Sequence, residues 1–245
     1  MLSRRQEIVF DDLRDISNLG PVKAVSNASN AVGKTLQKLL GITHSTTSKN
    51  YHKGILITST STKRGRTNLF ARVPDRDMSR YKSTTDLVRA VGRENKNKGY
   101  EKSLFCTVKA NVPNSFGLSL KVDSYHKVVD EMFTDDSNMT SSVVCWSIND
   151  LESRISELGD TAIVTAIPSH RNGSKYFHYR YVEFLGAPNA SKFGELLDNG
   201  IITLEHLISL KIGGASAIEK GPLFKISNAS RNLLYPQDSK YDLME

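Results

Sequence analysis

The sequence predicts an α+β fold in which helices flank a mixed β-sheet. Segments with the two-residue alternation of strands outnumber segments with helical periodicity, and hairpins are interspersed with helical crossovers. The chain has 245 residues, which suits a single domain over 1–245, with two lobes around a cleft as the alternative arrangement. Hydrophobic residues make up 38% of the chain, so we expect most of it to fold.

Five segments carry the signals of helices. The second of them follows a run of cap residues over 27–30 and ends at Gly41. The fourth begins after Ser147, which together with Asp150 resembles a capping box. We expect helices near 7–13, at about 31–40, over 84–92, from 148 to 158 and at about 190–199.

Short apolar or alternating runs indicate the strands. Two pairs are expected to form hairpins, 103–109 with 116–122 and 161–168 with 175–184. The second hairpin turns at Arg171-Asn172-Gly173, where the Asn-Gly pair favours a tight turn. The polar segment 236–245 is expected to fray. Further strands are expected over 54–58, 69–73, 142–146, 201–212 and 223–226.

The charge of the chain favours an acidic partner. The formal net charge is +7 and the isoelectric point is about 9.3, which is typical of proteins that bind nucleic acid or an anionic surface. The excess is modest for this length, so a basic protein without a polyanionic partner stays an alternative.

Targeting and redox signals point to a cytoplasmic protein without a membrane partner. Cys106 and Cys145 are the only cysteines, and they form neither a disulfide framework nor a metal-ligand spacing. The N-terminus lacks the apolar core of a signal peptide. No apolar run approaches the roughly 20 residues of a membrane span.

A series of blocks resembles one family of nucleases. The clearest block is VCWSINDL at 144–151, and the blocks keep one order and an approximate spacing from residue 27 to about 227. Together they resemble the MvaI/BcnI family of restriction endonucleases, whose fold is similar to that of the mismatch-repair nuclease MutH. The resemblance implies a restriction-endonuclease-like fold that binds and cuts double-stranded DNA with Mg²⁺. The other blocks are 31–40, 67–70, 103–109, 116–120, 175–180 and 197–202.

The residues that cut DNA in this family are missing from the expected positions. The resemblance implies an Asp, then a Glu-x-Lys on the following strand, with a further Glu in the early helix. No Asp or Glu occurs anywhere in residues 32–62, so no small shift of register recovers a carboxylate. We therefore expect no metal site, no cofactor and a catalytically degenerate protein. The family's positions are held by Gln37 (helix Glu), Asn50 or Tyr51 (Asp), Leu56 (Glu) and Thr58 (Lys).

Two alternatives to a degenerate DNA-binding protein stay open. The one Glu-x-Lys of the chain is Glu94-Asn95-Lys96, with Asp86 upstream, and it would give an active Mg²⁺-dependent endonuclease with a rearranged site. The same residues also read as a solvated charge cluster in a turn. The other alternative is a non-enzymatic protein-interaction module.

Cationic segments are the candidates for DNA contact. His52 and Lys53, with His44, crowd the segment of the lost site, and a phosphate-contacting loop is favoured over an acid/base pair because no carboxylate is near in sequence. The phosphate-contact candidates of the next segments are Lys63, Arg64, Arg66 and Lys109.

Two further segments are candidates for reading or supporting the duplex. His170, Arg171 and Asn172 lie at the tip of the second hairpin, where such side chains either reach base edges or face solvent. Lys211 and Lys220 flank a Gly-Gly loop that is longer and His-rich in active relatives. The sequence thus predicts a double-stranded DNA-binding protein of a restriction–modification or DNA-defence system, with a nuclease or a methyltransferase as a candidate partner.

Overall fold

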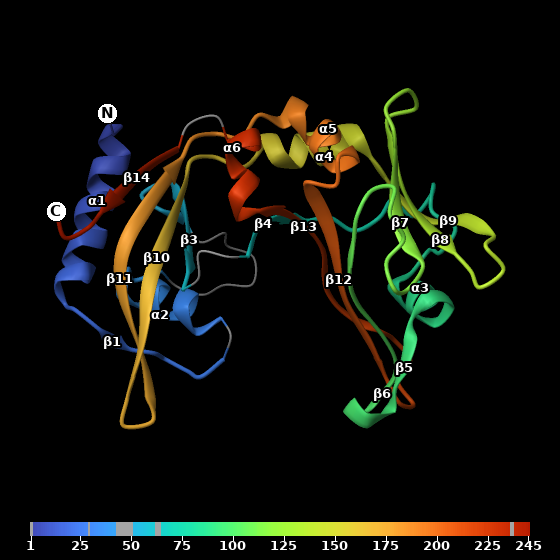
Figure 1. Cartoon of the computed structure of the whole chain (residues 1–245), viewed down its shortest axis with the longest axis horizontal. Helices are drawn as coiled ribbons and strands as arrows, with labels where there is room; N and C mark the ends of the chain where they lie inside the picture. Colours follow the sequence, from blue (N-terminus) through green and yellow to red (C-terminus); the bar gives the residue numbers. More distant parts are fainter. Residues whose placement is uncertain (1, 29, 43–50, 62–64, 236–237) are drawn as a thin grey trace. The chain divides into compact units, whose positions relative to one another are not determined.

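The computed structural model describes residues 2–28, 30–42, 51–61, 65–235 and 238–245, except for the side chains of Lys220 and Asp238. The chain forms two compact units, and each combines segments that are distant in the sequence. Unit 1 comprises Met1–Gly65, Ser156–Pro188 and Tyr235–Glu245, and unit 2 comprises Arg66–Ile155 and Asn189–Leu234. The expected α+β class is confirmed, and Figure 1 labels the elements.

Unit 1 is built on a six-stranded mixed sheet. Its strand order is β1-β11-β10-β3-β2, and β14 also pairs with β11. The sheet is mixed because β10 runs parallel to β3, while the other pairs are antiparallel. The elements of unit 1 are α1 (Arg4–Asn18), β1 (Val22–Lys23), α2 (Ala31–Leu39), β2 (Tyr51–His52), β3 (Ile55–Thr60), β10 (Thr161–Arg171), β11 (Ser174–Leu185) and β14 (Asp238–Asp242).

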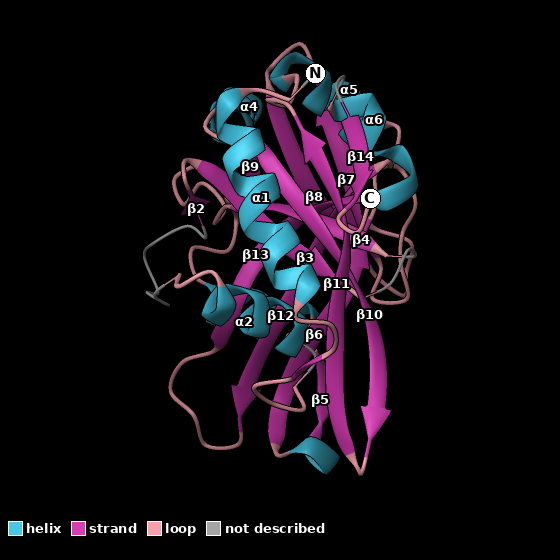
Figure 2. Cartoon of the chain, turned by 90° about the vertical axis from the view of Figure 1, so that its left-hand side faces the viewer, coloured by secondary structure: helices cyan, strands magenta, loops and turns pink. Residues whose placement is uncertain are grey.

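Helices α1 and α2 cover one face of this sheet (Figure 2). Helix α1 begins at a capping box in which Ser3 and Gln6 satisfy each other's backbone N–H groups, and it runs well past the expected 7–13. Its buried residues Val9 and Leu13 join one apolar cluster with α2, β3, β10 and β11. Only one face of β3, the face with Ile55 and Ile57, therefore belongs to the hydrophobic core of unit 1.

The expected hairpin of 161–168 with 175–184 is confirmed as β10 and β11. The two strands pair from Thr161 with Leu185 to Arg171 with Ser174, and the turn lies at Asn172-Gly173. Figure 1 shows their paired ends running to a free tip. Both turn residues have positive φ, 49° and 72°, which explains an Asn followed by a Gly.

The C-terminal segment does not fray over 238–245. Strand β14 pairs with β11 from Asp238 with Leu185 to Asp242 with Tyr181. Arg180 forms an ion pair with Asp242, and Leu243 is fully buried in the core of unit 1. The expectation of a loose tail is wrong because a polar strand at a sheet edge is held by backbone pairing, which hydrophobic patterning does not reveal.

Unit 2 consists of two antiparallel sheets. One has the strand order β4-β13-β12-β6-β5, and the other has the order β7-β8-β9. The strands of unit 2 are β4 (Arg66–Ala71), β5 (Arg93–Asn95), β6 (Tyr100–Val108), β7 (Leu118–Asp123), β8 (Val128–Thr134), β9 (Thr140–Ser147), β12 (Ile202–Lys211) and β13 (Ile218–Ser227). Its helices are α3 (Thr84–Val91), η1 (Lys96–Lys98), α4 (Ile148–Ser156, ending at the boundary with unit 1), η2 (Ala190–Lys192), α5 (Phe193–Asp198), η3 (Asn228–Ser230) and α6 (Arg231–Leu234).

Aromatic side chains join the two sheets of unit 2. Phe224 of β13 stacks on Phe70 of β4, with 5.2 Å between ring centroids. Trp146 of β9 meets the same Phe224 edge-on at 5.8 Å, and Phe193 of α5 packs against it at 5.7 Å. These contacts join β4, β9, β13 and α5, which are distant in the sequence, in one hydrophobic core.

The expected hairpin of 103–109 with 116–122 is wrong. Strand β6 pairs with β5 and β12, whereas β7 pairs with β8 in the other sheet. The connection between them is fixed by Asn114, whose Oδ1 accepts from the N–H groups of Phe116 and Leu118 and whose Nδ2 donates to the Thr107 carbonyl. Strand β8 was not expected, because the buried Glu131 interrupts its apolar pattern. Residues 94–96, expected in a turn, instead lie in β5 and η1.

No helix among the described residues is long and apolar enough to cross a membrane.

Candidate functional site

Strand β3 turns its residues alternately to the core and to the opposite face of the sheet. Ile55 and Ile57 are buried in the cluster with α1 and α2. Leu56 and Thr58 are half-buried, and because side chains alternate along a strand they point to the opposite face. The positions at which the resemblance places the catalytic Glu and Lys therefore share one face of the unit 1 sheet, and they carry an aliphatic chain and a hydroxyl.

The neighbours of Thr58 on that face supply little charge. Ile163 of β10 pairs with both Thr58 of β3 and Glu183 of β11, so the three side chains lie in one row across the sheet. Neighbouring strands are about 4.8 Å apart, which puts the Glu183 backbone about 10 Å from that of Thr58. Glu183 also has an interaction partner of its own.

Helix α2 adds a neutral group where the resemblance places a carboxylate. Gln37 is half-buried, and its Oε1 atom is buried without a hydrogen-bond partner in the described structure. The Oγ atom of Ser59 on β3 is also buried without a partner, and it lies 3.6 Å from where a Cβ on Gly33 of α2 would sit. An unpaired buried polar atom costs about 1–3 kcal/mol. These two unpaired atoms therefore do not stabilise the packing of α2 on β3.

These residues do not fit the Mg²⁺ that the resemblance implies. Magnesium requires oxygen ligands at close to 2 Å, and its protein ligands are mainly carboxylates. Leu56 offers no oxygen, Gln37 and Thr58 offer neutral ones, and Tyr51 is a half-buried phenol opposite Leu56 on β2. Asn50 lies outside the described residues. No group of three or more His, Cys, Asp or Glu within the described ranges could hold a metal ion.

His52 is paired with a carboxylate that the sequence did not place beside it. Its Nε2 atom lies 2.6 Å from Oδ2 of Asp12 on α1, and its side chain is 15% exposed. His52 pairs with Ile55 across β2 and β3, so it lies on the core side of the sheet and away from Leu56 and Thr58. The neighbouring Lys53 is exposed in a left-handed turn, with φ 52°. Of the two residues, Lys53 is the one that presents its charge to solvent.

The tip of the β10–β11 hairpin presents three exposed side chains. His170, Arg171 and Asn172 are all exposed, as expected for the end of a hairpin. The guanidinium of Arg171 lies 5.8 Å from the ring centroid of Tyr176 on the facing strand. This cation–π contact turns Arg171 back along the hairpin and restricts its side chain.

The five-stranded sheet of unit 2 has one polar face, which sequence reasoning missed. Along β12 the even-numbered residues from Ile202 to Leu210 face the core of unit 2, so the odd-numbered ones point the other way. On this opposite face Lys225 of β13 forms an ion pair with Glu205 of β12, with side chains 17% and 26% exposed. The missed signal was the alternation of polar residues over 201–212. We call this face, with Arg66, Asn68, Thr107, Thr203, Glu205 and Lys225, the polar face of the five-stranded sheet.

The cations of the polar face lie close to one another. Arg66 of β4 donates from Nη1 to Oγ1 of Thr107 on β6, at 3.1 Å. Burial lowers the pKa of Lys225, and the nearby charge of Arg66 lowers it further. The polar face thus concentrates positive charge that is only partly compensated by Glu205.

The other sequence candidates are spread over the chain. Lys109 and Lys211 are exposed at the ends of β6 and β12. Lys220 lies in β13, but its side chain is not described. Lys63 and Arg64, like His44, lie outside the described residues.

The rival Glu-x-Lys has the geometry of a surface ion pair. Glu94 and Lys96 contact each other at 3.0 Å with side chains 69% and 68% exposed. Asp86 instead accepts a hydrogen bond from Ser83 at the start of α3. The three residues do not converge on one point, so the interpretation as a solvated charge cluster fits better than a metal site.

Comparisons with known proteins agree with this fold. The sequence model of the MvaI/BcnI restriction endonuclease family matches residues 10–235. The structure is similar to that of restriction endonuclease MvaI in complex with cognate DNA, with a TM-score of 0.82, 19% identity, and coverage of 99% of this chain and 100% of that one. It is also similar to MvaI in the absence of DNA, with a TM-score of 0.57, 18% identity and 98% coverage of both chains. No curated protein sequence matches the chain.

Proposed function

Because the chain belongs to the MvaI/BcnI restriction endonuclease family, we propose that it binds double-stranded DNA and does not cleave it. The observation that carries the second half of the proposal is the face of β3 that holds Leu56 and Thr58. A Glu and a Lys are expected there in an active member, and the described residues around them do not replace the lost charge.

Binding to DNA is supported by the chemistry of the polar face. The structure of MvaI with its cognate DNA matches 99% of this chain. This chain also carries a net charge of +7. Lys and Arg side chains neutralise phosphates and also bind guanine, while a Glu can accept from the amino group of cytosine. The pair of Lys225 and Glu205 therefore offers a donor and an acceptor side by side, which suits a G·C base pair.

Loss of cleavage follows from electrostatics. Hydrolysis of a phosphodiester by this family requires a metal ion to stabilise charge and to activate water. Neutral oxygens at Gln37 and Thr58 would not compensate the cost of removing the hydration shell of Mg²⁺. A DNA-binding protein of this kind would act in restriction–modification or DNA defence through an active partner, such as a nuclease or a methyltransferase.

Salt-dependent binding and a cleavage assay test the two halves of the proposal. We expect duplex DNA to bind with an affinity that falls steeply with salt, and supercoiled plasmid to stay intact with Mg²⁺ or Mn²⁺. The double variant Lys63→Ala with Arg64→Ala should weaken binding on any sequence and lower the salt slope by about two, since each phosphate contact contributes about one.

The outcomes separate the alternatives. Cleavage that disappears in a Glu94→Gln variant would establish the rearranged nuclease instead. Absence of binding at low salt would leave a protein-interaction module. Unchanged affinity of the double variant at low and moderate salt would remove 63–64 from the DNA footprint.

A further inference from the structure

Unit 2 contains a small cavity beneath the segment that connects β4 to α3. Its volume is about 60 Å³. On this measure a water needs about 10–15 Å³, so the cavity has room for about four waters or for one small tetrahedral oxyanion. The residues that give it chemical character are Arg76, Lys82, Thr84, His206 and Glu219, with apolar walls from Val144 and Leu87.

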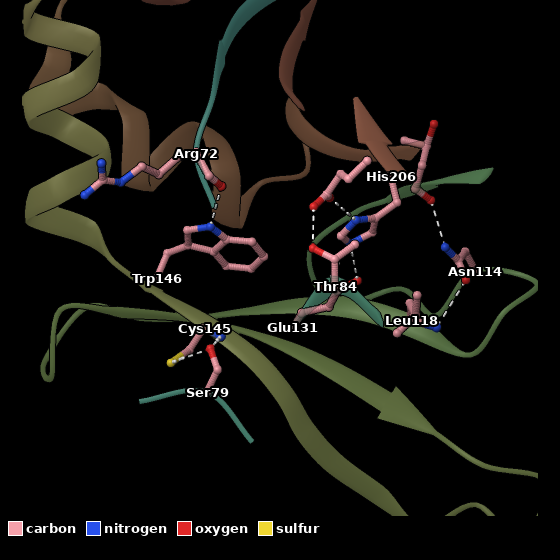
Figure 3. A network of polar contacts seen from close by, with 11 residues as sticks. Arg72, Ser79, Thr84, Asn114, Leu118, Glu131, Cys145, Trp146 and His206 are labelled. Carbon is pink, nitrogen blue, oxygen red and sulfur yellow. Dashed lines mark hydrogen bonds and ion pairs between the residues drawn. The ribbon is translucent and has the colours of Figure 1, made fainter. Parts of the chain in front are cut away.

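His206 brings an unused donor to this cavity. Its side chain is 1% exposed, and its Nε2 atom lies 2.9 Å and 3.0 Å from the two carboxylate oxygens of Glu131 on β8 (Figure 3). Burial alone would lower the pKa of His206, but the carboxylates of Glu131 and Glu219 raise it to about 9. At neutral pH the ring is therefore protonated on both nitrogens.

The second nitrogen of this ring has no hydrogen-bond partner in the described structure. The Nδ1 atom of His206 is buried and unpaired, and Oε1 of Glu219 lies 3.8 Å away from it. A buried charged donor without an acceptor is costly. The cavity is thus arranged around a donor that a bound group would satisfy.

Glu219 places an acceptor next to that donor. Its Oε2 atom accepts a hydrogen bond of 2.8 Å from Oγ1 of Thr84, which fixes the carboxylate. Its Oε1 atom is the one nearer to His206. A ligand that fits this cavity accepts a hydrogen bond from Nδ1 of His206 and donates a hydrogen bond to the carboxylate of Glu219.

Positive charge predominates around the cavity. Glu131 is balanced by the imidazolium of His206, which leaves Glu219 against the two cations Arg76 and Lys82. Lys82 donates to the Asp77 carbonyl at 3.0 Å, which holds its ammonium group near the segment that roofs the cavity.

We propose that this cavity binds a protonated phosphate group, as hydrogen phosphate or as a phosphomonoester. Such a group is a tetrahedral anion whose bare oxygens accept from His206, Arg76 and Lys82 while its P–OH donates to Glu219. Sulfate and phosphodiesters carry no proton near neutral pH, so the Glu219 carboxylate repels them. This site lies in unit 2 on the core side of the five-stranded sheet, opposite to the polar face, and it does not depend on DNA binding.

Calorimetric titration at about pH 6.5 and constant ionic strength tests the proposal with four probes. Sodium phosphate and thymidine 5′-monophosphate each have a titratable proton, since the second pKa of a phosphomonoester is about 6. Sodium sulfate and dimethyl phosphate do not. We expect one-to-one binding of phosphate or of the nucleotide, at least about tenfold tighter than either control, because a hydrogen bond to a charged group contributes that factor or more.

The stronger of the two proton-bearing probes identifies the source of the phosphate group. If neither phosphate nor the nucleotide binds, the proposal is overturned. Equal affinity for sulfate or for dimethyl phosphate also overturns it, because the proton would then play no part.

Two variants locate the effect. Glu219→Gln removes the negative charge that excludes an unprotonated anion and adds an N–H donor, so the preference for phosphate over sulfate should fall by about tenfold or more. Glu94→Gln at an exposed ion pair should keep that preference. Arg76→Ala should weaken phosphate binding by a similar factor, and Arg89→Ala on the same unit should not.

The fluorescence of the single tryptophan, Trp146, checks the fold of each variant. Trp146 donates to the carbonyl of Arg72, at the start of the segment that connects β4 to α3. A folded Glu219→Gln protein that still prefers phosphate contradicts the proposal.

Discussion

Strand β3 of unit 1 and strand β12 of unit 2 have the same construction and opposite chemistry. Each packs alternate residues into a hydrophobic core and turns the others to a second face. On β3 that second face carries Leu56 and Thr58, whereas on β12 it carries Glu205 paired with Lys225. Half-buried ion pairs give little net stability, because removing charges from water costs about as much as their attraction returns. The two faces therefore differ in the charge that they offer to a ligand, and the proposed binding without cleavage predicts such a difference.

Restoring charge to β3 is the change with the largest expected effect. We expect the triple variant Asn50→Asp, Leu56→Glu, Thr58→Lys to cleave DNA in the presence of Mn²⁺, whereas the parent protein leaves the same plasmid intact. Plasmid nicking and linearisation measure it. The matched control Leu56→Gln with Thr58→Met keeps the side-chain volumes without the charges and should stay inactive. A folded triple variant that binds Mn²⁺ and leaves DNA intact would contradict the assignment of β3 as the strand that decides cleavage.

The interior of unit 2 should respond to pH, because it contains the buried pair of His206 and Glu131. The pKa of His206 is raised to about 9, so its contribution to folding is complete below the ordinary value near 6.5 and is lost as pH rises through 9. We expect the unfolding free energy of unit 2 to fall by roughly 3 kcal/mol across that range. Urea unfolding followed by the fluorescence of Trp146 measures this unit, and a Glu131→Gln variant should flatten the dependence. Equal stability at about pH 6.5 and 9.5 would contradict the prediction.

The polar face of the five-stranded sheet should dominate DNA affinity. Lys225→Ala removes a cation and leaves the Glu205 carboxylate to repel phosphates, so we expect duplex affinity to fall by about thirtyfold, or about 2 kcal/mol. Fluorescence anisotropy with a labelled duplex measures it. Lys192→Ala is the control, since Lys192 also pairs with a Glu but lies exposed beside α5. Equal affinities of the two variants would remove the polar face from the DNA interface.

A smaller effect is expected at the hairpin tip. Arg171 is held against Tyr176, so it reaches less far beyond the tip than a free arginine. If it reads a base, Arg171→Ala should reduce the preference between duplexes by about 1–3 kcal/mol and keep non-specific binding. A uniform loss over all sequences would identify a phosphate contact, and no change would identify a solvent-exposed turn.

Patterns that depend on local sequence could be predicted, and pairings between distant segments could not. The β10–β11 hairpin follows from its alternation and its Asn-Gly turn. Helix α2 follows from its apolar stripe and from Gly41, whose φ is 66° just after the helix ends. The separation of β6 from β7 into different sheets depends on Asn114, whose side-chain contacts a linear pattern does not reveal. The edge strand β14 was missed because its stability comes from pairing with β11.

The candidate site divides in the same way. The absence of carboxylates from 32–62 is a property of the sequence, and the structure adds that Leu56 and Thr58 share one face. The carboxylate of Asp12 reaches His52 from α1, 40 residues earlier, which no spacing rule would have placed there. Similarly, Lys225 and Glu205 meet only because β12 and β13 pair.

The most direct test of binding without cleavage examines the DNA inside the complex. An end-labelled duplex is incubated with the protein and Mg²⁺, the retarded complex is cut from a native gel, and its DNA is run on a denaturing gel. We expect a retarded complex whose two strands are full length. Shortened strands in that complex, or no complex at any protein concentration, would contradict the proposed function.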